Sequence, residues 1–163
     1  MKTVKQKMKE IRNSITNVIV YFNIDVKGEP ENVSEWRVVM QQNQSLEITK
    51  VALDAMGGDY APAEPVKGAV DAVNARSDIR VLLIGQEDVV RKELEKYTYP
   101  AEQIEVIHAE EVIETAKPPV NAIRRKKQSS IVVGMNMVKQ KEADAFVAAG
   151  SSGAILVGGQ VIV

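Results

Sequence analysis

The pattern of hydrophobic and polar positions along this chain changes near residue 49. From there on, short apolar runs of strand length alternate with stretches whose apolar residues recur every three or four positions, the spacing of one helix face. The apolar runs predict strands at 51–53, 79–85, 104–107 and 145–148. The amphipathic stretches predict helices at 65–75, 87–97, 120–127 and from Ser129 or Ser130 to about residue 141. Strands separated by helices indicate a parallel sheet with right-handed crossovers.

The first 48 residues follow a different pattern. Residues 1–13 are rich in lysine, with apolar residues at helical spacing, and predict a short amphipathic helix. Residues 18–26 are rich in β-forming types and predict a strand, and 36–40 predict a second one. The segment is too short to bury much surface alone. It is either a small appended module or an upstream extension without a fold of its own, and we favour the extension.

The stretch around which the rest is organised is residues 51–59. An apolar run leads to Asp54, then to Gly57-Gly58 and Asp59, which predicts a tight turn at the carboxyl end of a buried strand. In an open α/β sheet, loops at this edge form the ligand crevice. The glycines permit a positive φ or the close approach of a ligand. The aspartates can bind backbone amides and hold the turn, bind a cation or steer a proton.

A second glycine-rich turn follows the strand expected at 145–148. Gly150 and Gly153 bracket Ser151 and Ser152, ahead of an apolar segment that favours a helix. Backbone amides at a helix N-terminus together with hydroxyl groups make an anion site. The alternative is an ordinary β–α turn. The spacing matches neither the phosphate-binding P-loop nor the dinucleotide fingerprint.

Two further features are ambiguous from the residues alone. The basic run Arg124, Arg125, Lys126 and Lys127 is either a solvated helix face or a contact for anionic ligands. His108 is the only histidine, and we interpret it as a strand-end residue rather than a base. One histidine with scattered carboxylates offers no metal-ligand spacing, so we expect no metal site.

Composition narrows the class of protein. With 45% hydrophobic and 26% charged residues, the composition is typical of a globular protein. Its net charge of -1 implies no overall electrostatic attraction to nucleic acid. No apolar run reaches the roughly 18 residues of a membrane-spanning helix, and we see no secretory signal. The absence of cysteine fits a reducing cytoplasm. It also excludes a cysteine nucleophile, a disulfide and a thiolate metal site.

Three motifs resemble one family. Residues 53–62, LDAMGGDYAP, resemble the opening of the bacterial phosphate acyltransferases of phospholipid synthesis, the PlsX family. Residues 122–130 resemble its basic segment, and 148–154 resemble its AGSTGA or AGNTGA signature, with serine in place of threonine. The resemblance covers about 51–163, which leaves 1–48 as an extension outside it. Because the family continues well past residue 163, residues 49–163 are interpreted as the N-terminal portion of a phosphate acyltransferase domain.

The resemblance implies a fold and an activity. The fold is a Rossmann-like three-layer α/β/α sandwich with a mostly parallel sheet, similar to isopropylmalate dehydrogenases and truncated here at the C-terminus. The activity is transfer of a long-chain acyl group from acyl carrier protein to inorganic phosphate, giving acyl phosphate. Phosphate is itself the nucleophile, so no cofactor is implied, and no catalytic residue is assigned. We expect this truncated chain to have little activity alone.

The resemblance also implies site residues and partners. Phosphate and the acyl group would lie near Asp54, Gly57, Gly58, Asp59, Gly150, Ser151, Ser152 and Gly153. The acidic carrier protein would dock on the basic run at 124–127. The family is usually dimeric at full length, and the resemblance leaves room for peripheral membrane association. A short-chain phosphotransacetylase using coenzyme A and a non-catalytic α/β fragment with an anion pocket remain as alternatives.

Overall fold

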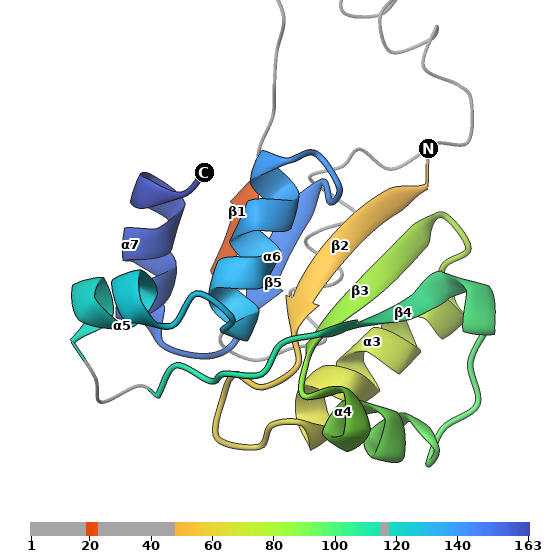
Figure 1. Cartoon of the computed structure of the whole chain (residues 1–163). Coiled ribbons are helices and arrows are strands. Elements are labelled where there is room, and N and C mark those ends of the chain that lie inside the picture. Colours follow the sequence, from red (N-terminus) through yellow and green to blue (C-terminus); the bar gives the residue numbers. More distant parts are fainter. Residues whose placement is uncertain (1–18, 23–47, 115–117) are drawn as a thin grey trace, which may run out of the picture.

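A computed structural model describes residues 19–22, 48–114 and 118–163 (Figure 1). Its strands are β1 (Ile19–Phe22), β2 (Thr49–Asp54), β3 (Ile79–Gly85), β4 (Ile104–His108) and β5 (Ala145–Ala148). Its helices are α3 (Ala63–Ala75), α4 (Glu87–Leu94), the 3-10 turn η1 (Ala101–Gln103), α5 (Pro119–Arg125), α6 (Ser130–Lys139) and α7 (Ser152–Val161). The helix expected at 1–13 and the strand expected at 36–40 lie outside the described residues.

The strands form one sheet in the order β1-β5-β2-β3-β4. Four of them, β5, β2, β3 and β4, are parallel, whereas β1 adds to the edge of β5 in the antiparallel direction. In the register of β2, Leu53 pairs with Leu83 on one side and with Val147 on the other. The carboxyl ends of β2 and β5 are therefore neighbours, although their residues are far apart in the sequence.

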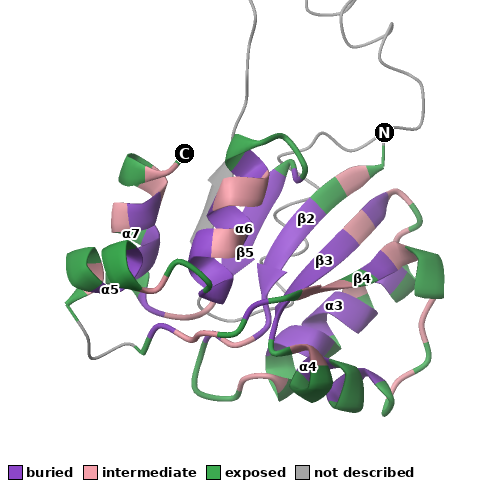
Figure 2. Ribbon diagram, in the orientation of Figure 1, coloured by how far each residue is buried: buried purple, intermediate pink, exposed green. Residues whose placement is uncertain are grey.

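Helices cover both faces of the sheet, which gives the three-layer sandwich (Figure 1). Because side chains alternate along a strand, Val51 and Leu53 pack against α3 and α4 while Ala52 packs on the side of α6. Strands β2, β3 and β5 are consequently buried over most of their length, as Figure 2 shows. A parallel sheet covered on both faces requires such near-continuous apolar strands. The α/β fold class expected from the sequence is confirmed.

Most element boundaries agree with the sequence pattern. The strands at 79–85 and 145–148 are as expected, and the apolar segment after Gly153 is helical. Helix α6 ends at Lys139 rather than near residue 141, because Lys141 takes the left-handed conformation with φ 62. Such a residue stops a helix by turning the chain out of it.

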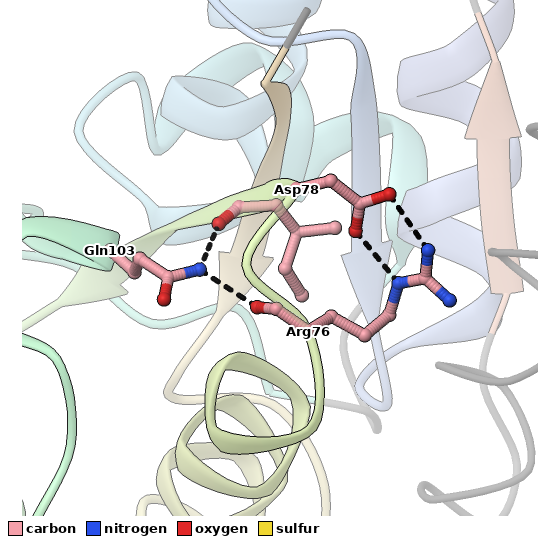
Figure 3. A network of polar contacts seen from close by, with 4 residues as sticks. Arg76, Asp78 and Gln103 are labelled. Carbon is pink, nitrogen blue, oxygen red and sulfur yellow. Dashed lines mark hydrogen bonds and ion pairs between the residues drawn. The ribbon is translucent and has the colours of Figure 1, made fainter. Parts of the chain in front are cut away.

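The amino-terminal edge of the sheet is held by a polar network (Figure 3). The guanidinium of Arg76 donates to both carboxylate oxygens of Asp78, at 2.9 and 2.7 Å. The side-chain amide of Gln103, in η1, donates to the carbonyls of Arg76 and Ile79 at 2.8 and 2.7 Å. The network ties the α3–β3 turn to the start of β4, at the opposite edge from the glycine-rich loops.

Candidate active site

The two glycine-rich loops contact each other at the carboxyl edge of the sheet. A Cβ atom added to Gly57 would lie 2.9 Å from the Gly150 nitrogen, and one added to Gly150 would lie 3.1 Å from the Gly57 Cα. Gly58 has a φ of +97, and a Cβ there would lie 3.4 Å from the Cβ of Ala149. The close approach and the positive φ both require glycine. The loops at 55–59 and 149–153 thus form one continuous surface.

Asp54 lies beneath this surface. It is 2% exposed, and its Oδ1 accepts a hydrogen bond from the Met56 N–H at 3.0 Å. The Gly57 N–H and the Ser130 hydroxyl also bind its carboxyl group. Burial raises the pKa of Asp54 above its ordinary value, and these hydrogen bonds lower that pKa by a smaller amount. The carboxyl group therefore holds the turn together from the interior. Binding of backbone amides was one of the three roles that the sequence allowed for this aspartate.

The two serines of the second loop have different surroundings. Ser151 is buried and caps α7, because its hydroxyl oxygen accepts a hydrogen bond from the Ala154 N–H at 3.4 Å. Ser152 is exposed and is the first residue of α7. The first N–H groups of a helix have no partner within the helix and carry its positive dipole end. Ser152 and Gly153 consequently offer amides, and Ser152 a hydroxyl group, to an anion.

Helix α5 begins next to this loop, and the basic run lies at the other end of that helix. A Cβ added to Gly153 would lie 3.2 Å from the Cγ of Pro119, the first residue of α5, and the run begins at the end of that helix. Arg124, Arg125 and Lys127 are exposed. Lys126 differs, because its ammonium group donates to the Val112 carbonyl at 2.5 Å and so faces the preceding loop.

Other candidate residues lie apart or point outward. Asp59 is exposed on the first loop, whereas His108 ends β4, which β3 separates from β2. Within the described ranges, no group of three or more His, Cys, Asp or Glu residues could hold a metal ion. No helix in the same ranges is both long and apolar enough to cross a membrane.

A groove of about 250 Å³ lies elsewhere, between the sheet and the C-terminal part of α6. Its walls are formed by Lys50, Arg80, Leu82, Glu105, Ile107, Met137 and Glu142. Lys50 and Arg80 stand near the amino ends of their strands, so the groove opens away from the glycine-rich loops. We therefore assign the candidate site from the loops and not from this hollow.

The contact of Ser130 with Asp54 is not evident from the sequence, in which Ser129 and Ser130 are alternative helix caps. In the structure Ser129 is the cap, with its hydroxyl oxygen accepting from the Val132 N–H at 3.4 Å. Ser130 instead points to the carboxyl group of Asp54. Two adjacent serines before an apolar run signal a cap, but nothing local identifies a partner on a distant strand.

Fold and site together define an α/β sandwich domain whose two glycine-rich loops meet beside a helix N-terminus. The family model described as "Fatty acid synthesis protein" matches residues 49–163, and the chain belongs to this family. The resemblance stated from the three motifs is confirmed.

Curated relatives carry a more specific name. The "Phosphate acyltransferase" of Alkaliphilus oremlandii is 52% identical over 113 residues, which are 69% of this chain and 33% of that protein. The "Phosphate acyltransferase" of Clostridium tetani is 47% identical over 114 residues, 70% of this chain and 34% of the relative. The protein of the same name from Dictyoglomus turgidum is 49% identical over 107 residues, 66% and 32% of the two chains. The chain thus spans about a third of the length of these relatives.

Proposed function

We propose that this chain is the N-terminal part of an enzyme that transfers an acyl group from acyl carrier protein to inorganic phosphate, giving acyl phosphate. The name of the relatives supports the reaction class. The observation that carries the proposal is the contact of Gly57 and Gly58 with the loop at 149–153, beside the N-terminus of α7. This arrangement provides amides, a hydroxyl group and a helix dipole at one exposed point.

Phosphate would bind to the amides of Ser152 and Gly153 and to the Ser152 hydroxyl. The positive end of α7 favours an anion there, and glycine backbone allows it to approach closely. Gly58 and Asp59 would form the facing wall. The carboxylate of Asp59 would have to point away from phosphate or orient a cationic donor, because two anions in contact repel.

The reaction requires few catalytic groups from the protein's side chains. A phosphate oxygen attacks the thioester carbonyl, a C–O bond forms, the C–S bond breaks, and the carrier leaves as a thiolate that takes up a proton. The protein must hold phosphate next to the carbonyl and place donors near the developing oxyanion. Since phosphate is the nucleophile, a nucleophilic side chain is not required.

The proposal is tested by titrating the chain with inorganic phosphate while its backbone amides are followed by NMR. We expect the largest shifts at Gly150–Ala154 and at Gly57–Asp59. Shifts confined to the groove near Lys50 and Arg80, or no saturable shifts, would contradict the proposed site. Chloride at the same ionic strength is the control, because it reproduces the screening but not the tetrahedral anion.

The acyl donor is tested separately, with the full-length enzyme that carries this segment. Phosphate-dependent release of thiol from a long-chain acyl carrier protein is expected to be much faster than release from short-chain acyl coenzyme A. The reverse order would favour a phosphotransacetylase. Absence of release from both donors, with phosphate still bound, would favour a non-catalytic anion-binding domain.

A further inference from the structure

Asp54 connects segments that are distant in the sequence. Its carboxyl group binds the Met56 and Gly57 amides of its own loop and the Ser130 hydroxyl in the first turn of α6. Both side chains are buried, Asp54 at 2% and Ser130 at 1% exposure. The end of β2 is therefore tied to the start of α6 through one pair of side chains.

The start of α6 is a favourable place for this carboxyl group. Helix α6 runs for 10 residues, and its N-terminal turn carries the positive end of its dipole. A buried polar group is costly unless it is hydrogen-bonded. Here the hydroxyl and two amides satisfy Asp54, so the pair is retained in the interior.

The position of Asp54 also determines the position of the second loop. A Cβ on Gly57 would overlap the Asp54 Oδ2 atom, and one on Gly150 would lie 3.5 Å from the same oxygen. The carboxyl group, Gly57 and Gly150 are thus stacked without space between them. A displaced carboxyl group would move both loops, and with them the N-terminus of α7.

We propose that Asp54 and Ser130 are a positioning pair that fixes the two glycine-rich loops in the geometry needed to bind phosphate. The inference rests on the proposed function, which it deepens. Asp54 acts through Gly57 and Gly150 and not by touching phosphate, because the loop covers it. Ser130 acts through Asp54.

The neighbouring serine provides a matched control. Ser129 is buried like Ser130, but its hydroxyl group donates to the Lys126 carbonyl at 2.8 Å and accepts from the Val132 N–H. Ser129→Ala removes a helix cap, which typically costs about 1 kcal/mol of stability. It leaves the Asp54 contact in place. Ser130→Ala removes that contact and leaves the cap.

The test compares phosphate affinity and amide exchange in the two variants of the whole chain. We expect Ser130→Ala to weaken binding of inorganic phosphate about tenfold, because binding would then have to restore a loop geometry that this hydrogen bond otherwise fixes. Exchange of the Met56 and Gly57 amides should accelerate as well. Ser129→Ala should keep the affinity within about twofold even though its melting temperature falls.

A double-variant cycle adds a readout that a general loss of stability would not reproduce. Combining Asp54→Asn with Ser130→Ala should weaken phosphate binding no more than the stronger single change, because both remove the same contact. If the two single changes reduce the phosphate affinity additively in the double variant, Asp54 and Ser130 do not act as a pair. The proposal is also wrong if Ser130→Ala changes neither the phosphate affinity nor the amide exchange. If the original chain binds no phosphate, the proposed function fails, and the exchange of Met56 and Gly57 still decides whether Ser130 holds the loop.

Discussion

The Gly150 nitrogen lies so close to Gly57 that no side chain fits between them: a Cβ on Gly57 would come within 2.9 Å of it. This contact joins the loop after β2 to the loop after β5. It is possible only because the two strands are neighbours in the sheet. The proposed phosphate site depends on it.

Gly57→Ala should therefore destabilise the chain. The added methyl group would overlap the Asp54 carboxyl group and the Gly150 backbone, and overpacking of this kind costs about 1–3 kcal/mol. Urea denaturation measures the change in the free energy of unfolding. Gly159→Ala, at a half-buried position in α7, is the control and should be neutral or slightly stabilising, because alanine favours helix. Equal free energies of unfolding for the two variants would contradict the close contact between Gly57 and Gly150.

Ser152→Ala should impair phosphate binding in the full-length enzyme. Ser152 is exposed at the start of α7, so its loss removes a hydroxyl group without disturbing the core. One hydrogen bond to a charged group contributes about 1.5–3 kcal/mol, which corresponds to a rise of roughly tenfold to hundredfold in the KM for phosphate. The KM for the acyl carrier should change little. Equal increases in both values would show that Ser152 is not specific for phosphate.

The free energy of unfolding should contain a pH-dependent contribution from Asp54. The folded state raises the pKa of this carboxyl group above its ordinary value of 3.8, so folding favours the protonated form. The contribution is fully present below 3.8 and is lost as pH rises through the pKa of the folded state. Asp54→Asn removes it.

The check is urea denaturation of both proteins from acid to neutral pH. The stability of Asp54→Asn relative to the original chain should rise as pH increases above 3.8. Other titrating groups cancel in this difference because both proteins share them. A difference that changes in the opposite direction would mean that folding lowers the pKa of Asp54.

Reversing the charge of the exposed arginines should slow association with acyl carrier protein. Arg124 and Arg125 are exposed at the end of α5, where they can attract an acidic partner. The association rate of the Arg124→Glu, Arg125→Glu variant should fall most at low salt, where screening is weakest. Lys126→Met is the control and should mainly affect stability, because Lys126 binds the Val112 carbonyl. If carrier binding is unchanged at low ionic strength, the basic run is only a solvated helix face and does not contact the carrier.

Removal of residues 1–48 should leave a cooperatively folded domain. The three motifs and the family match lie outside this segment, but its strand β1 pairs with β5 along the register from Ile19 opposite Ala148 to Phe22 opposite Ala145. We expect a modest fall in melting temperature with the transition still cooperative. Thermal melts of 49–163 and of the whole chain measure this. A broad transition, or failure of the shorter chain to fold, would show that β1 is an essential part of the sheet.

The sequence by itself determined the elements and the family. Continuous apolar runs such as Ile79–Gly85 indicate buried parallel strands, and the glycine pairs after residues 54 and 148 indicate where two strands end. These signals are local: they depend on the spacing of residues within one element. They also sufficed to place both loops at the carboxyl edge of a parallel sheet.

The tertiary structure alone decided which residues of these loops touch and which distant side chains meet. That β5 lies beside β2, so that Gly57 contacts Gly150, depends on the path of the three crossovers that lead from β2 to β5. The inward direction of Lys126 and the contact between Ser130 and Asp54 depend on how α5 and α6 pack against the sheet. Spacing along the chain carries no information about such contacts, because they form between segments whose separation in sequence does not determine their distance in space.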